Sequence, residues 1–213
     1  MIKIFTLLEN NYSYIIENRS GVFIIDPGES DKIISYLKSK NLIPNYILLT
    51  HHHIDHVGGL EDILEKYKNC VIIDSHTNKE ILKTLKIEML LTPGHTEDSC
   101  CYYFKEEGGI FTGDTLFTGI CGRIMDGKSY KEMFKSLNRL KALPRETKLY
   151  PGHEYIQHSI DFMEKLSLDP GYYKKLSLMN MPSTNSTIGL EIDNNLFMTS
   201  NFDKFAYYRR LKG

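Results

Sequence analysis

The chain has 213 residues, of which 41% are hydrophobic and 25% charged, a balance typical of a folded globular protein. Its 26 basic and 27 acidic residues give a net charge of −1, so no overall positive field attracts nucleic acid or an anionic membrane. No apolar run approaches the roughly 20 residues of a membrane-spanning helix, and the N-terminus lacks the sections of a signal peptide, so we expect a cytoplasmic protein without a nucleic-acid or membrane partner.

The first half of the chain alternates short apolar runs with helical stretches. Turn-forming residues bound the apolar runs, which predicts strands at residues 2–8, 12–17, 22–25, 46–49, 71–73 and 89–91. Apolar residues at helical spacing predict helices at residues 31–40, 60–67 and 78–85.

The second half repeats this rhythm, with strands predicted at residues 100–104, 109–111 and 148–150 and helices at residues 129–142, 154–166 and 172–178. After Asn180 the pattern weakens, and we expect a polar loop and a short, Tyr-rich tail. Strands and helices in mixed order predict an α/β protein of the α+β type, in which helices cover the sheets.

The four cysteines do not form a disulfide framework, because none belongs to a Cys-x-x-Cys pair and two are adjacent. They are Cys70, Cys100, Cys101 and Cys121. We expect reduced, mostly buried thiols, and we interpret Cys121 as a packing residue and not as a nucleophile.

The most informative segment is residues 50–56, THHHIDH, which contains the pattern His-x-His-x-Asp-His. Neutral imidazole and carboxylate groups are common metal ligands. Alternate residues of a turn leaving a strand point the same way, so His51 and His53 would bind one ion. Asp55 and His56, one turn further on, would bind a second, whereas His52 would point away from both.

Three more residues follow strands and turn-forming residues, and they could complete two metal sites. They are His95 after Pro93-Gly94, Asp114 after Gly113, and His153 after Pro151-Gly152. One ion would be bound by His51, His53, His95 and Asp114, and the other by Asp55, His56, His153 and a bridging Asp114. Such ions would lie about 3.5–4 Å apart and could share a hydroxide. Nitrogen and oxygen ligands fit zinc, with iron or manganese as alternatives.

Other polar residues carry weaker signals. His76 and His158 have no supporting context, and we expect them at the surface. Asp26 ends a strand before Pro27-Gly28, so it is either a plain turn former or a hydrogen-bond partner of a ligand histidine.

These motifs resemble known families. Residues 50–59, THHHIDHVGG, resemble the signature of the metallo-β-lactamase superfamily. Residues 111–117 (FTGDTLF), 121–123 (CGR) and 151–155 (PGHEY) resemble glyoxalase II, the hydroxyacylglutathione hydrolases, and residues 182–184, Glu191 and residues 195–197 resemble the start of its C-terminal region. The resemblance implies a four-layer αββα sandwich, with a catalytic domain at residues 1–165 and a short, truncated C-terminal region at residues 166–213.

The same resemblance implies a thioester hydrolase that converts S-D-lactoylglutathione to D-lactate and glutathione by a metal-bridging hydroxide. Asp55 and Asp114 would orient this nucleophile, and Arg123 and Tyr155 would bind the glutathione part of the substrate.

The chain departs from the family pattern in three places. Ile54 stands where the family commonly has Trp, and Met125 stands where it has a Tyr. The first basic residue after residues 195–197 is Lys204, whereas the family places basic residues directly there. The departures leave the hydrolytic centre intact and predict weaker recognition of glutathione, with a high KM.

Three alternatives are open. One is a hydrolase of the same fold that acts on another thioester, a lactone or a phosphoester. Another is a mononuclear-iron persulfide dioxygenase, which keeps two His and one Asp, so the presence of Asp55, His56 and His153 favours two metals instead. The third is a non-catalytic metal-binding or scaffold protein, which a complete and open ligand set does not favour.

Overall fold

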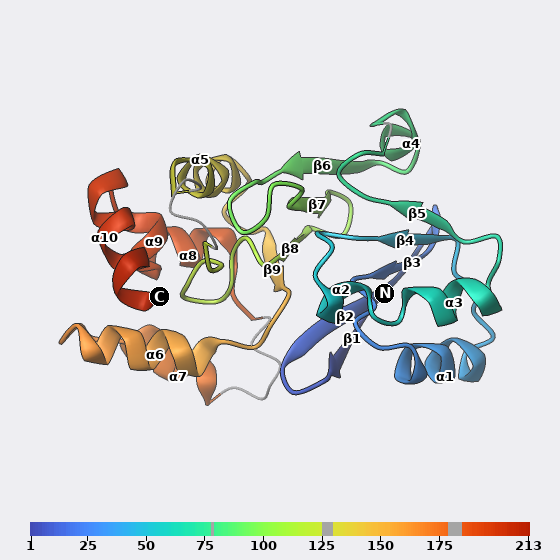
Figure 1. Ribbon diagram of the computed structural model, residues 1–213, viewed down its shortest axis with the longest axis horizontal. Coiled ribbons are helices and arrows are strands. Elements are labelled where there is room, and N and C mark those ends of the chain that lie inside the picture. The colour runs from blue at the N-terminus through green and yellow to red at the C-terminus, as the bar shows by residue number, and fades with distance from the viewer. Residues whose placement is uncertain (78, 125–129, 179–184) are drawn as a thin grey trace.

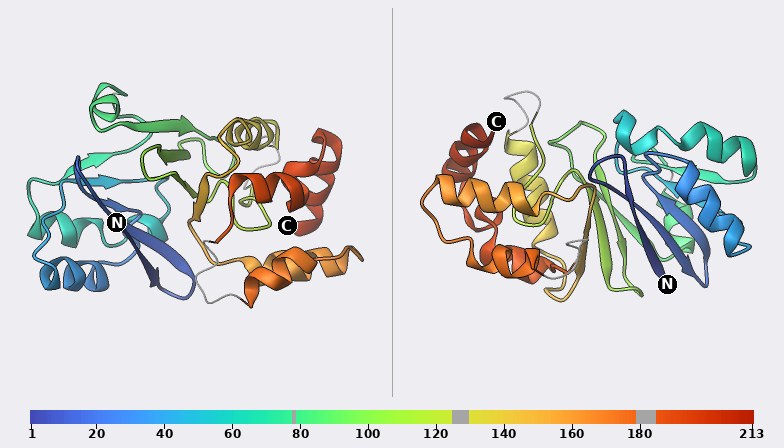
Figure 2. Two further views of the ribbon diagram at one scale, coloured as in Figure 1. Left: turned by 180° about the vertical axis from the view of Figure 1, so that it is seen from behind. Right: turned by 90° about the horizontal axis from the view of Figure 1, so that it is seen from below.

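The computed structural model describes residues 1–77, 79–124, 130–178 and 185–213. Two β-sheets face each other, and helices cover the outer side of each sheet (Figures 1 and 2). This is the four-layer αββα arrangement that the resemblance implied. One sheet holds β1 (Ile2–Leu7), β2 (Asn11–Asn18), β3 (Gly21–Ile25), β4 (Tyr46–Leu48) and β5 (Val71–Ile73), and the other β6 (Ile87–Leu91), β7 (Cys100–Phe104), β8 (Gly109–Gly113) and β9 (Lys148–Pro151).

Within each sheet the strands follow one another in chain order. Hairpins join β1, β2 and β3, and likewise β6, β7 and β8, in antiparallel pairs. The later pairs are parallel and need a crossover, which helices supply. These crossover helices are α1 (Asp31–Ser39) before β4, α2 (Ile54–Val57) and α3 (Leu60–Lys66) before β5, and α5 (Tyr130–Leu140) before β9. The crossovers place polar residues at the ends of β4, β8 and β9.

Aromatic side chains fill the space between the sheets. Phe111 stacks on Tyr150 with ring centroids 4.8 Å apart, and Tyr14 of the opposite sheet meets Phe111 edge-on at 4.9 Å. The helices bury one apolar face each: α1 buries Ile33 and Leu37 against the first sheet. Removing such side chains from water is the main stabilising contribution to a fold of this kind.

Five of the described helices lie in the C-terminal third of the chain, beside the second sheet and α5 (Figure 2). They are α6 (Ile156–Lys165), α7 (Gly171–Ser177), α8 (Ile188–Asn194), α9 (Leu196–Thr199) and α10 (Phe202–Lys212). The remaining described helix, α4 (Lys79–Thr84), precedes β6. Phe197 and Phe205 pack in one cluster with Met133 of α5.

The expected loop and tail after Asn180 were therefore wrong for residues 188–212, which are mostly helical. Thr187, Asn195 and Asn201 cap the three helices by accepting hydrogen bonds from backbone N–H groups. The apolar pattern of α10 is weak because its buried face includes a charged residue, Arg209, beside Phe205. The short helix α2 also went unpredicted, since four residues show no periodicity.

Two further expectations can be compared with the structure. All four cysteines are buried and free, as predicted. No helix in the described part of the chain combines the length and the apolar composition needed to cross a membrane.

Candidate active site

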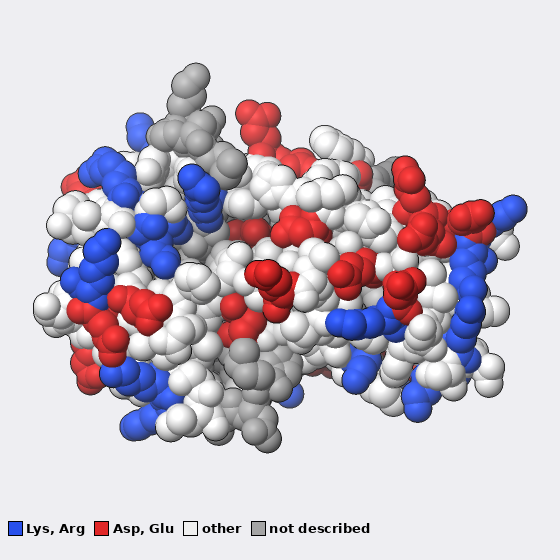
Figure 3. All heavy atoms as spheres, turned by 60° about the horizontal axis from the view of Figure 1, so that its bottom comes forward, with Lys and Arg blue, Asp and Glu red and all other residues white. Residues whose placement is uncertain are grey.

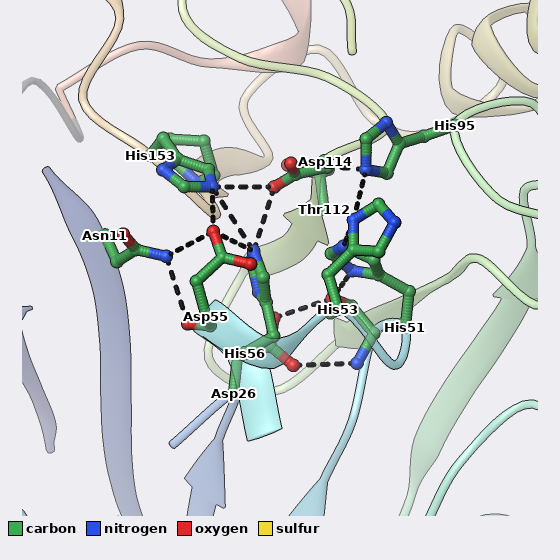
Figure 4. A network of polar contacts seen from close by, with 12 residues as sticks. Asn11, Asp26, His51, His53, Asp55, His56, His95, Thr112, Asp114 and His153 are labelled. Carbon is green, nitrogen blue, oxygen red and sulfur yellow. Dashed lines mark hydrogen bonds and ion pairs between the residues drawn. The ribbon is translucent and has the colours of Figure 1, made fainter. Parts of the chain in front are cut away.

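Seven side chains with nitrogen or oxygen donors meet at the ends of strands from both sheets (Figure 4). They are His51, His53, Asp55 and His56 after β4, His95 between β6 and β7, Asp114 after β8, and His153 after β9. Their donor atoms fall into three overlapping groups, and the atoms within each group lie within 4.8 Å of one another. The structure thus brings together all seven residues that the sequence singled out as metal ligands.

Three imidazoles form the first group. His53 Nδ1 lies 3.1 Å from His51 Nε2 and 3.0 Å from His95 Nε2. Asp114 borders this group, with its Oδ2 atom 3.5 Å from His95 Nε2. Nitrogen lone pairs that converge so closely repel one another unless a cation or a proton lies between them.

The second group combines imidazoles and carboxylates. His56 Nε2 and His153 Nε2 are 3.3 Å apart, and Asp55 Oδ2 lies 3.4 Å from His153 Nε2. Asp114 Oδ1 lies 3.3 and 3.4 Å from the two imidazole nitrogens, yet this buried atom makes no hydrogen bond within the described part of the chain. Asp114 therefore faces both groups, one oxygen to each, and has an unsatisfied buried oxygen where a cation would fit.

Asp26 organises two of the imidazoles from behind. One of its oxygens accepts a hydrogen bond from the Thr50 hydroxyl at 2.6 Å and lies 3.0 Å from His56 Nδ1. Thr50 Oγ1 is in turn 3.1 Å from His51 Nδ1. Of the two interpretations open for Asp26, the structure supports the hydrogen-bond partner. Such contacts fix which imidazole nitrogen keeps its proton and which stays free to bind.

Two of the other imidazoles, those of His95 and His153, also have partners on their far side. His95 Nδ1 donates to the Arg123 carbonyl at 2.8 Å, and His153 Nδ1 lies 3.0 Å from Asn10 Oδ1. Asn11 donates to the backbone and side-chain oxygens of Asp55, both at 3.0 Å. Asn10 lies in the turn between β1 and β2, and Asn11 is the first residue of β2, so the N-terminal hairpin helps to orient the second group.

Burial and nearby charges set the protonation states of these groups. Burial lowers the pKa of His51 to about 3 and also lowers that of His95. Burial alone would raise the pKa of Asp114, but His56 and His153 hold it well below its usual range. Burial would also lower the pKa of His56, but Asp114 and Asp26 raise it well above its usual value. A divalent metal ion would therefore displace a proton from His56, whereas His51 and His95 are already neutral.

The remaining histidines lie outside this cluster. His52 is exposed, contacts Asp98, and lies 3.6 Å from Asp74, so it points away from the cluster. His76 and His158 are exposed, as expected, although His158 lines the pocket described next.

A pocket of about 430 Å³ adjoins the cluster. Tyr155 connects the two, because its ring stacks on His153 with centroids 4.9 Å apart and an interplanar angle of 2°. The pocket is lined by Asn10, Phe117, Ile120, Cys121, Arg123, Tyr155, His158, Arg209, Lys212 and Gly213. Both predicted substrate-binding residues, Arg123 and Tyr155, therefore lie in its wall. Figure 3 shows several Lys and Arg side chains over the end of the molecule that the C-terminal helices form.

Two basic residues of the pocket, Arg209 and Lys212 of α10, were not among the predicted substrate-binding residues. Lys204, the first basic residue after residues 195–197, is not among the residues that line the pocket. Arg209 and Lys212 are three residues apart and thus share a helix face. The Asn201 cap was the signal that could have revealed this helix.

Some residues of the resemblance lie elsewhere. Met125 and residues 182–184 fall outside the described residues. Ile54 is exposed in α2, between His53 and Asp55, so the site has an apolar side chain at its rim. Glu191 is fully buried and accepts hydrogen bonds from Ser186, Asn195 and the Gly119 N–H.

Comparison with known proteins agrees with this geometry. The family model of the Metallo-beta-lactamase superfamily matches residues 7–88 and 79–153. A hydroxyacylglutathione hydrolase of Pelagibacter ubique is 37% identical over 99% of this chain and 98% of its own length. One of Tolumonas auensis is 31% identical over 94% and 86%.

A solved structure, that of TTHA1623 in a di-iron-bound form, is similar as well. It is 26% identical, has a TM-score of 0.66, and covers 92% of this chain and 99% of that chain. The similarity thus extends to the arrangement of the chain in space and to a protein that holds two metal ions.

Proposed function

Since the chain belongs to the metallo-beta-lactamase superfamily and, within it, to the hydroxyacylglutathione hydrolases, we propose that it hydrolyses S-D-lactoylglutathione to D-lactate and glutathione at the site around Asp114. The observation that carries the proposal is the position of Asp114, whose two oxygens face His95 on one side and His56 and His153 on the other, beside a pocket lined by basic residues. A group of candidate metal ligands next to a pocket lined by basic side chains suits an anionic thioester substrate.

The donor set fits two divalent ions. Its nitrogen atoms converge at 3.0–3.3 Å, and Asp114 Oδ1 is buried without a hydrogen bond. We assign His51, His53, His95 and Asp114 to one ion, and Asp55, His56, His153 and Asp114 to the other. When bound, the ions would lower the pKa of water towards 7 and polarise the thioester carbonyl. Nitrogen and oxygen donors suit zinc, with iron or manganese as alternatives.

The side chains of the chain itself supply position and orientation. Asp55, held by Asn11, and Asp114, held between two imidazoles, accept hydrogen bonds from the attacking water and orient it towards the carbonyl carbon. The water oxygen bonds to the carbonyl carbon and its protons are released to solvent. The C–S bond breaks, the acyl part leaves as D-lactate, and the sulfur leaves as the thiolate of glutathione. A thiolate is a good leaving group, so no strong general acid is required.

The pocket would bind the peptide part of the substrate. Arg123 is exposed in its wall and can pair with a carboxylate. Burial raises the pKa of Tyr155 to about 12, so its hydroxyl stays protonated and can donate a hydrogen bond. Weak recognition of glutathione, with a high KM, stays a prediction. It was made without Arg209 and Lys212, whose positive charges also line the pocket.

We propose the same division of the chain as the resemblance implied. Residues 1–165 carry the seven candidate ligands, and residues 166–213 supply Arg209 and Lys212 to the pocket. A cytoplasmic location is likewise a proposal, supported by four free cysteines. The alternative of a mononuclear dioxygenase does not explain why Asp55, His56 and His153 lie close enough together to bind a second metal ion.

A steady-state comparison tests the proposal. Purified protein would be assayed with S-D-lactoylglutathione and with a small thioester that lacks the peptide, before and after chelation and add-back of metal. We expect two ions per chain, a higher kcat/KM for the glutathione thioester, and loss of activity on chelation. Full activity of verified metal-free protein would contradict the mechanism, and equal kcat/KM for both thioesters would contradict the assignment of glutathione.

A further inference from the structure

The segment after Asp114, residues 115–123, is held from outside by the C-terminal region. Glu191 of α8 accepts a hydrogen bond from the Gly119 N–H at 2.9 Å. Arg209 of α10 donates from Nη1 to the Cys121 carbonyl at 2.9 Å and to the Gly122 carbonyl at 3.2 Å. An acidic side chain thus binds a backbone donor and a basic side chain binds backbone acceptors of the same segment.

Arg209 is unusual because it is a buried cation. Its exposed fraction is 4%, and among the described residues no Asp or Glu side chain forms an ion pair with it. Its guanidinium group is surrounded by two backbone carbonyls, the Gly213 oxygen at 2.8 Å and the Phe197 ring at 5.5 Å. Its Nε atom has no hydrogen-bond partner in the described part of the chain. Burial of a charge is costly, so simple packing would be served better by an apolar residue.

The carbonyls that Arg209 binds lie next to the metal cluster. Gly122 packs on the cluster so closely that a Cβ atom there would lie 1.7 Å from the Asp114 carbonyl oxygen and 3.4 Å from His95 Cβ. The next residue, Arg123, accepts the hydrogen bond of His95 Nδ1 at 2.8 Å. That hydrogen bond leaves His95 Nε2 directed at His53 and Asp114.

We propose that Arg209 is a positioning residue of the metal centre: by holding the Cys121 and Gly122 carbonyls it fixes the Arg123 carbonyl that orients His95. The planar guanidinium group suits this role, because one nitrogen can serve two carbonyls while another binds a third oxygen. The inference rests on the proposed metal-binding role of His95. It makes α10 part of the support of the metal centre, in addition to its place in the pocket wall.

The test measures metal affinity in the absence of substrate. Cobalt(II) would be titrated into metal-free Arg209→Met, Arg209→Lys and Arg210→Met proteins in competition with a chelator, and the visible spectrum of the bound cobalt recorded. Arg210 is an exposed arginine on the same helix and is the matched control. We expect about tenfold weaker binding for Arg209→Met, since loss of outer contacts commonly costs 10–100-fold in affinity. Arg209→Lys should lie between, and Arg210→Met should equal the parent.

A double variant separates positioning from general destabilisation. In a His95→Ala background, Arg209→Met should weaken cobalt binding much less than tenfold, because the contact through which it acts is absent. An undiminished loss in that background would overturn the proposal.

Other results would overturn it as well. Unchanged cobalt affinity and spectrum in folded Arg209→Met, with only a raised KM, would assign Arg209 to substrate binding alone. If Arg209→Met does not fold, Arg209→Gln takes its place, because it keeps one amide donor. Cobalt affinity equal to that of the parent in folded Arg209→Gln would also overturn the proposal. Failure to hydrolyse S-D-lactoylglutathione would refute the proposed function without changing these metal titrations.

Discussion

The side chains that form the candidate metal site come from strand ends in both sheets. Those that line the pocket come from the turn between β1 and β2, the loop after β8, and the segments around α6 and α10, and several of them are exposed. His51, His56 and His153 are each at most 4% exposed. In the pocket, Arg123 and His158 are exposed. From this difference we infer that the candidate metal ligands are held in fixed positions and that the substrate is recognised nearer the surface. Substitutions in the two regions should therefore affect kcat and KM differently.

Glycines mark the same contrast. A Cβ atom at Gly152 would lie 2.4 Å from Asp114 Oδ1, and one at Gly28 would lie 2.1 Å from the Asp55 carbonyl oxygen. At Gly213, in the pocket wall, nothing lies within 4 Å of such an atom. The cluster therefore tolerates no added atom, whereas the pocket has room for change.

The largest effect should follow from loss of the shared carboxylate. We expect Asp114→Ala to lose both metal ions and at least about a hundredfold in kcat/KM, since even partners outside the ligand set cost 10–100-fold. His52→Ala is the control, because His52 is exposed and contacts Asp98 instead of the cluster. Metal analysis and steady-state kinetics measure both, and equal losses in the two variants would refute the sharing of Asp114.

The pocket should respond differently. Arg123→Ala is expected to raise KM for S-D-lactoylglutathione by about ten- to a hundredfold with a small change in kcat, because a charged hydrogen bond is worth roughly 1.5–3 kcal/mol. Kinetics with a thioester lacking the peptide provide the control and should be unchanged. An equal response to both substrates would mean that Arg123 supports the cluster and not the peptide.

Tyr155 tests the boundary between the two regions, since its ring stacks on His153 and the residue also lines the pocket. Tyr155→Phe keeps the ring, so we expect KM to rise by about two- to tenfold, as for a neutral hydrogen bond, with kcat and metal content preserved. Tyr155→Ala is the comparison that also removes the stacking. Loss of metal from Tyr155→Phe would contradict the separation.

The smallest effect should be on the thermal stability of the protein, through Glu191, which binds the segment at residues 115–123. Burial raises the pKa of Glu191 above its ordinary value of 4.5, so the folded state binds this proton more tightly than the unfolded state. Its stabilising contribution is full below pH 4.5 and is lost as pH rises through the folded-state pKa. Glu191→Gln should therefore gain in Tm relative to the parent as pH rises through this window. A Tm difference independent of pH would show that Glu191 titrates normally.

Much of the cluster could be predicted because metal chemistry demands particular residue types at short spacing. The THHHIDH segment follows a clear apolar strand, and His95, Asp114 and His153 each follow a strand and a turn residue. Most strands were predictable too, since turn residues bound their apolar runs.

The rest depended on contacts between distant segments. Asn10 meets His153 only after the N-terminal hairpin packs against the residues that follow β9, where the Tyr12 N–H donates to the Gly152 carbonyl. Asn11 meets Asp55 only after β2 packs against α2. Arg209 replaces an apolar residue on the buried face of α10, which hides the helix period. No short-range pattern encodes either arrangement.

The order of strands also bears on how the protein comes into being. Each sheet is made from one unbroken half of the chain, so each can form through contacts between neighbours in sequence. The first half carries His51, His53, Asp55 and His56, and the second half carries His95, Asp114 and His153. Neither half alone can complete a binding group around His53 and His95 or around Asp55 and His153. The metal-binding groups therefore form only after the two halves of the chain have docked, and we expect metal-dependent activity to begin at that step of folding.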